Sequence, residues 1–205
     1  MAVGRTFEES LLKAIRSLET GKCHIYDPKF DRMSEKDLLD YIAIGTDDRI
    51  YAIAALIRKG TGLYRIVNAT KIDLFFLEKI SHITEIEKLV AANPFDTAVL
   101  YEAKRNGFSD KYIGQIWGKS EKEIFLFRKE KGIMPVYKMI DTCAGEFSAY
   151  VPYFYSTYEQ ENESIVSDKE KIIVLGSGPI RIGQGVEFDY STVHAIWAIQ
   201  QAGYE

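Results

Sequence analysis

Residues 70–94, TKIDLFFLEKISHITEIEKLVAANP, predict the longest helix of this chain. Thr70, with Asp73 three positions later, is placed to cap the first turn, and Asn93-Pro94 is placed to end the helix. Between them, apolar residues recur at helical spacing, at Ile72, Phe75, Phe76, Ile80, Ile83, Ile86 and Leu89. Because a helix of about 20 residues with this much apolar surface needs cover, other helices must pack on it.

The same start and stop signals predict shorter helices on both sides of this one. Upstream, we expect three helices, which cover residues 7–20, 35–44 and 47–58 and are capped by Thr6, Ser34 and Thr46. Downstream, we expect one helix from Asn93-Pro94 to Gly107 and two short ones over residues 109–117 and 120–131. Ser120 and Glu123 have the spacing of a capping box at the start of the last helix. Residues 34–132 therefore have the pattern of a helical domain.

The composition changes at Pro135. Residues 136–159, VYKMIDTCAGEFSAYVPYFYSTYE, are rich in Tyr, Phe, Val and Thr and favour extended backbone over helix. Residues 159–170, EQENESIVSDKE, are polar and acidic, which is typical of a linker between domains.

The overall composition excludes several classes of protein. Of the 205 residues, 46% are hydrophobic, which excludes a disordered tail, and the net charge of −4 gives no general footprint for nucleic acid or for an anionic membrane. Cys23 and Cys143 lie far apart, so they have no metal-binding spacing and fit a reducing compartment. The chain has no apolar run of about 18 residues and no signal peptide, so we expect no membrane contact and a cytoplasmic location.

A glycine-rich segment follows the linker. Residues 171–190 read KIIVLGSGPIRIGQGVEFDY, which predicts a buried strand at Ile172–Leu175, a loop, and a helix over residues 191–202. Gly176, Gly178 and Gly183 lack both the GK[ST] ending of a P-loop and the GxGxxG spacing of a dinucleotide fold. Such a turn is either a tight connection between strand and helix or an anion-binding site.

The loop is longer and more polar than a simple connection. It also contains Pro179, Arg181, Gln184, Gly185 and Glu187, whereas loops between strand and helix usually have two to six residues. Long polar loops at the carboxyl end of a strand commonly line a site. The loop is therefore a candidate functional site.

Three segments of the chain resemble the large subunit of carbamoyl-phosphate synthase. GSGPIRIGQGVEFDYSTVHA (176–195) is similar to the start of the second synthetase half of that family, and MAVGRTFEESLLKAIRSLE (1–19) is similar to the end of the first half. Residues 136–159 resemble the segment that leads into the second half. The helices between these segments lie where the family has its helical oligomerisation domain.

This resemblance implies a function for the larger protein to which such a chain would belong. The family makes carbamoyl phosphate from bicarbonate, glutamine-derived ammonia and two ATP, for arginine or for pyrimidine synthesis. It uses Mg²⁺ or Mn²⁺, and potassium is a further possible ion. ATP and metal would bind in ATP-grasp regions before and after this segment, so the isolated chain is expected to be inactive. The implied partners are further copies of the large subunit and a small glutamine amidotransferase subunit.

The resemblance also gives the glycine-rich loop a role. In the family, this loop borders the internal passage that delivers carbamate to the second phosphorylation site. Gly185 matches a small residue that keeps the passage open, Glu187 matches a carboxylate that lines it, and Arg181 lies in the same loop. A protected route is physically reasonable, because carbamate is short-lived in water.

A different function is possible for residues 107–133. Two short helices around Trp117–Ser120 have the outline of a helix-turn-helix, and Lys122, Arg128, Lys129 and Lys131 would supply a basic helix for nucleic acid. Glutamates at 121, 123 and 130 share that helix and would repel phosphates. The alternative is that this helical pair only packs within the domain. A third possibility is a pure association module, with exposed aromatic residues such as Phe75, Phe76, Phe125 and Phe127 as contacts.

These inferences define the expected architecture. The fold should be mainly α, with an all-helical oligomerisation domain followed by an incomplete α/β unit (strand, loop and helix) of the pre-ATP-grasp type. We predict three parts: the tail of the first synthetase half (1–20), the helical oligomerisation domain (21–163), and a linker with the start of the second half (164–205).

Overall fold

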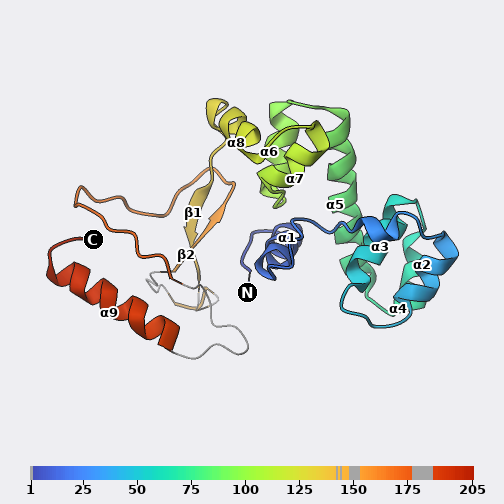
Figure 1. The fold of residues 1–205 in the computed structure, drawn as a ribbon, viewed down its shortest axis with the longest axis horizontal. Coiled ribbons are helices and arrows are strands. Elements are labelled where there is room, and N and C mark those ends of the chain that lie inside the picture. Colours follow the sequence, from blue (N-terminus) through green and yellow to red (C-terminus); the bar gives the residue numbers. More distant parts are fainter. Residues whose placement is uncertain (1, 142, 144, 148–152, 177–186) are drawn as a thin grey trace. The chain divides into compact units, whose positions relative to one another are not determined.

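The computed structural model describes residues 2–141, 143, 145–147, 153–176 and 187–205 (Figure 1). These residues form two compact units, Ala2–Glu163 and Ser164–Glu205. The first unit is helical with one small hairpin, and the second contains one helix. The mainly α fold expected from the sequence is confirmed, whereas the division of the chain into three parts stays a prediction.

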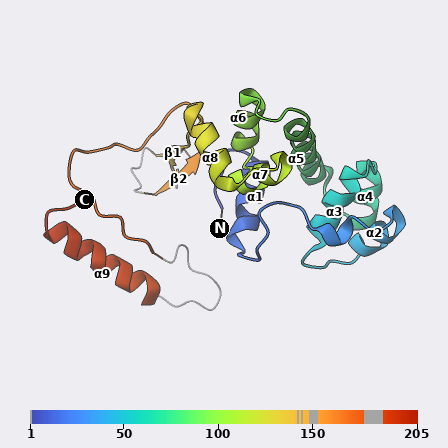
Figure 2. The same cartoon turned by 45° about the horizontal axis from the view of Figure 1, so that its top comes forward.

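The described part of the first unit has eight α-helices. They are α1 Phe7–Ser17, α2 Glu35–Ile42, α3 Arg49–Arg58, α4 Leu63–Thr70, α5 Leu74–Ala92, α6 Thr97–Arg105, α7 Asp110–Trp117 and α8 Glu121–Glu130, with a 3₁₀ turn at Pro28–Phe30. The long helix α5 runs between two groups of helices (Figures 1 and 2). Helices α3 and α4 contact it on one side and α6 and α7 on the other, and α1 also packs against it.

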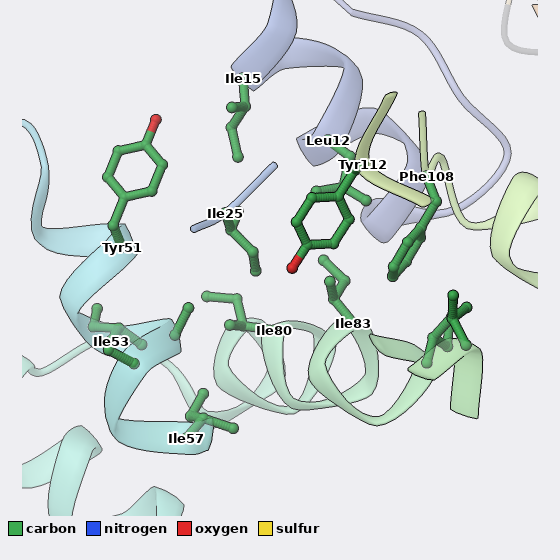
Figure 3. Packing of buried hydrophobic residues seen from close by; sticks show 14 of the residues in the cluster. Leu12, Ile15, Ile25, Tyr51, Ile53, Ile57, Ile80, Ile83, Phe108 and Tyr112 are labelled. Atoms are coloured by element: carbon green, nitrogen blue, oxygen red, sulfur yellow. The ribbon is translucent and has the colours of Figure 1, made fainter. Parts of the chain in front are cut away.

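One continuous apolar core joins these helices. Figure 3 shows Leu12 and Ile15 of α1 facing Ile80 and Ile83 of α5, with Tyr112 of α7 beside them. Leu12 and Ile83 are completely buried, and α3 contributes a run of seven buried residues from Tyr51 to Ile57. Because none of the short helices could be stable alone, this shared burial is what holds the unit together.

Three of the predicted helix starts in the helical unit are wrong. The helix expected from Asn93-Pro94 begins later, at Thr97, and is capped by Asp96. Thr46 does not cap α3, which begins three residues later at Arg49 after Asp48. Thr70 does not open the long helix. It is the last residue of α4, a helix that was not predicted, and Asp73 caps α5 instead. Between them Lys71 takes a left-handed backbone, with φ 59°, which ends α4 without a glycine. Thr70 had the residue type of a cap, but its hydroxyl donates back to the Ile66 carbonyl.

The other capping predictions agree with the structure. The side chains of Thr6, Ser34, Ser109 and Ser120 each accept a hydrogen bond from the backbone of their helix. Ser120 and Glu123 form a complete capping box. Gly107 and Gly132 follow α6 and α8 with positive φ, as expected for residues that end helices.

The extended segment after α8 forms a hairpin. Strands β1 Val136–Met139 and β2 Phe154–Thr157 pair antiparallel, with Val136 opposite Thr157 and Met139 opposite Phe154. The start of the predicted linker lies on the other edge of β1, where the Glu163 N–H donates to the Tyr137 carbonyl at 2.8 Å.

The second unit contains α9, Glu187–Gln201, which begins four residues before the predicted helix. The predicted strand Ile172–Leu175 is absent, and Ile173 and Leu175 are 83% and 92% exposed. A strand needs a hydrogen-bonded neighbour along its length, and within the described part of the chain these residues have one only at their start. There the Ile172 N–H donates to the Glu205 carbonyl and the Glu205 N–H donates to the Glu170 carbonyl, in the pattern of parallel neighbours.

Candidate functional site

Most of the predicted loop site falls outside the described residues. This applies to Gly178, Pro179, Arg181, Gly183, Gln184 and Gly185. Glu187 is the first residue of α9. Gly176 is described, and a Cβ built there would lie 3.4 Å from Thr192 Oγ1 of α9. The start of the loop therefore lies against the helix that follows it, and the role of the loop residues stays a prediction.

A cluster of partly exposed aromatic rings lies at the start of α5. Phe75 and Phe76, in the first turn of α5, are 50% and 43% exposed. Their ring centroids lie 6.2 and 5.4 Å from the ring of Phe7 at the start of α1. The edge and tilted arrangements are favourable for aromatic pairs. We call Phe7, Phe75 and Phe76 the aromatic cluster.

A cavity of about 440 Å³ opens beside this cluster. Phe7 and Phe75 form part of its wall, together with polar and charged residues of α1, α5 and α6 and with residues 157–159 at the end of the hairpin. Glu8 is buried there and accepts from His82 Nδ1 at 2.7 Å, while Lys79 Nζ lies 3.5 Å from the same carboxylate. The His82 side chain is 45% exposed, so it lies partly at the surface of α5.

The other proposed contact residues lie on α8. Phe125 is at the surface, with the Arg128 guanidinium 4.8 Å from its ring centroid. Phe127 is partly buried, and its ring packs edge-on against Phe95 and Trp117. Phe127 therefore belongs mainly to the packing of the helical unit, whereas Phe125 is available at its surface.

A buried carboxylate, Glu87 of α5, contacts side chains from α3, from α7 and from the segment that follows α1. It accepts two hydrogen bonds from Arg58 of α3, one from Nε and one from Nη2, both at 2.7 Å. It also lies 2.7 Å from Nε2 of His24 and 3.3 Å from the hydroxyl of Tyr112. This centre was not predicted from the sequence. The available signal was an isolated glutamate on the apolar face of α5, four residues after Ile83 and three before Val90.

The ionisation of this centre follows from burial and pairing. Burial by itself raises the pKa of Glu87, but the hydrogen bonds from Arg58 and His24 outweigh it and hold the pKa at about 2. Burial lowers the pKa of His24, and its hydrogen bond with Glu87 opposes this only in part. Near pH 7 the centre therefore holds an ionised glutamate, a charged arginine and a neutral histidine, which suits a structural role.

A second buried ionic group bears on the nucleic-acid alternative. Asp110, at the start of α7, accepts from Lys104 Nζ and from Arg128 Nε, both at 2.8 Å. All three residues are buried. Arg128 is thus paired inside the α7–α8 junction and is not part of an exposed basic face. Arg128, one of the four basic residues named for the nucleic-acid alternative, therefore ties the two helices together, whereas Lys122, Lys129 and Lys131 are exposed.

The described residues also limit two other kinds of site. Among them, no group of three or more His, Cys, Asp or Glu side chains is arranged to hold a metal ion. No helix in the described part of the chain is long and apolar enough to cross a membrane.

Two segments of the chain match models of known protein families. Residues 1–132 match the model of the carbamoyl-phosphate synthetase large chain, oligomerisation domain. Residues 168–205 match the model of the carbamoyl phosphate synthase preATP-grasp domain. The two matches occur in the order that the sequence resemblance implied, and the first covers more than half of the chain. The chain therefore belongs to the family of the carbamoyl-phosphate synthetase large chain.

Proposed function

We propose that this chain brings large chains of a carbamoyl phosphate-forming ligase together through its helical unit. The aromatic cluster supports this proposal most directly. It exposes rings on α5 within the segment that matches an oligomerisation domain. Apolar residues gathered at one surface favour association, because their burial removes apolar area from water.

We further propose that the chain acts as part of a complete large chain. The reaction would join bicarbonate and glutamine-derived ammonia in the cytoplasm with the use of two ATP. Nucleotide, Mg²⁺ or Mn²⁺, and potassium where it is used, would bind in the ATP-grasp regions, and a small glutamine amidotransferase subunit would supply the ammonia. Residues 1–205 alone would then show no carbamoyl phosphate synthesis in an ATP-dependent assay.

The glycine-rich loop would form part of the carbamate passage. Gly185 would keep the passage open, and Glu187 and Arg181 would lie along it. The test is Gly185→Phe in a large chain that contains this sequence. We expect ATP hydrolysis to continue while the yield of carbamoyl phosphate per ATP falls. An unchanged yield would exclude the loop from the passage.

Co-purification tests the association itself. Two copies of the chain with different affinity tags are produced together, and one tag is used for capture. We expect the second copy to be recovered with the first after extensive washing. Recovery of the captured copy alone would contradict the proposed association.

A further inference from the structure

Glu9 of α1 is a buried carboxylate with partners from two distant parts of the chain. It is 1% exposed and accepts a hydrogen bond from the backbone N–H of Arg5 at 2.7 Å. It also accepts from the hydroxyl of Thr157 in β2 at 3.2 Å and pairs with Lys13 Nζ at 2.7 Å. A buried carboxylate is tolerated only when it is paired in this way, so all of these contacts stabilise one arrangement.

Lys13 and Arg5 extend the contact between the same two segments. Lys13 Nζ donates to the carbonyl of Val3 at 3.0 Å and also to the carbonyl of Ser156. The Arg5 side chain lies 3.5 Å from the carboxylate of Glu159. Residues 3–5 and 156–159 are thus linked both directly and through side chains of α1.

Two glycines make room for Glu9. A Cβ at Gly4 would lie 2.9 Å from Glu9 Oε2, so a side chain there would crowd the carboxylate. Gly107 has φ +88°, and a Cβ there would lie 2.8 Å from Glu9 Cα. Arg16 Nη1 donates to the Gly107 carbonyl at 2.8 Å, which holds α1 against this turn. The backbone is therefore arranged for close approach around Glu9 on two sides.

The adjacent residue Glu8 provides a contrast. It is 2% exposed, so it is buried as deeply as Glu9. Its partners, however, are His82 and Lys79 of α5. Two neighbouring carboxylates on one helix thus contact different elements, and only Glu9 reaches the strand from which the chain runs on toward residue 168.

We propose that Glu9 is a positioning residue that couples the segment entering the helical unit, residues 3–6, with the strand leaving it, residues 154–159. Loss of order in either segment removes partners from the same carboxylate and loosens the other segment. In a large chain, this coupling would link the region before the helical unit to the region that matches the preATP-grasp domain. The coupling is a property of the Ala2–Glu163 unit and does not depend on the proposed self-association.

Hydrogen–deuterium exchange of the full 205-residue chain tests the proposal. Thr157→Val keeps the shape of the side chain and removes its hydroxyl. We expect it to raise amide exchange about tenfold in residues 154–159 and also in residues 3–6, which it does not alter chemically. Glu9→Gln should raise exchange in both segments, while exchange in α5 stays as in the wild type.

Glu8→Gln is the matched control, and it should leave residues 154–159 unchanged. The proposal is overturned if Thr157→Val loosens only its own strand. It is equally overturned if Glu8→Gln loosens residues 154–159 as much as Glu9→Gln does, because the effect would then come from α1 as a whole. If Glu9→Gln does not fold, the Thr157→Val result alone tests the proposed coupling.

Discussion

The guanidinium of Arg58 and the carboxylate of Glu87 form a two-point ion pair, with both N–H···O distances at 2.7 Å. The pair joins the end of α3 to the apolar face of α5. His24, which follows α1, and Tyr112 of α7 contact the same carboxylate. Four separate parts of the unit therefore depend on the Glu87 side chain. This relationship makes Glu87 the polar centre of an otherwise apolar core.

Glu87→Gln should therefore lower the free energy of unfolding by about 3 kcal/mol. This value is the lower end of the range of destabilisation expected when a buried ion pair loses one partner. The low end applies because the Arg58 side chain is 21% exposed and keeps some contact with water. Urea unfolding followed by circular dichroism measures the change. Glu78→Gln, on an exposed position of the same helix, is the control and should change stability by less than about 0.5 kcal/mol. Equal effects of the two variants would show that Glu87 is not a stabilising centre.

The same centre predicts a loss of stability in acid. His24 has a lowered pKa in the folded chain, so unfolding takes up a proton, and stability should begin to fall below the unfolded pKa of about 6.5. Glu87 has a folded pKa of about 2 against an ordinary value of 4.5, so its contribution should be lost as the pH falls from 4.5 toward 2. Urea unfolding at a series of pH values measures both steps. In His24→Gln the step below pH 6.5 should disappear, and its persistence would assign that step to another group.

Gly107→Ala should destabilise the chain more than Gly118→Ala. Both glycines have positive φ, so each substitution carries the strain of a left-handed alanine, about 1 kcal/mol or more. Only at Gly107 would the new Cβ meet the backbone of Glu9, at 2.8 Å, whereas nothing lies within 4 Å at Gly118. Thermal unfolding of the two variants compares them directly. Equal losses of stability would mean that α1 does not need this close approach.

Replacement of exposed rings in the aromatic cluster should weaken association. Phe75→Ser with Phe76→Ser removes two side chains that are about half exposed, so the cost to folding should be smaller than for buried phenylalanines. We expect recovery of the second tagged copy in co-purification to fall at least tenfold. Phe125→Ser, at the surface of α8, is the comparison variant. If it alone abolishes recovery, the interface lies on α8 rather than at the aromatic cluster.

Local signals in the sequence predicted most of the helices. The Ser-x-x-Glu pattern at Ser120 and Glu123 and the glycine at 107 act through neighbouring backbone, so their effect is visible in the sequence. Thr70 misled the prediction because threonine can cap a helix or bond back within one, and the left-handed Lys71 gave no glycine signal.

The contacts within the candidate sites depended on tertiary structure. Glu9 and Thr157 are 148 positions apart, and Glu87 and His24 are 63 apart, so no local pattern could pair them. The expected strand at Ile172–Leu175 shows that a local pattern can also predict an element that does not form. An apolar run favours a strand, but the strand forms only where a hydrogen-bonded neighbour continues along it.

The most direct test of the proposed association is the molar mass of the purified chain, measured by light scattering after size exclusion over a hundredfold range of concentration. Self-association predicts a mass that rises with concentration toward at least twice the chain mass of 23.4 kDa. The Phe75→Ser and Phe76→Ser double variant should stay near the mass of one chain over the same range. A wild-type chain that remains at 23.4 kDa at every concentration would contradict the proposal that this unit joins large chains.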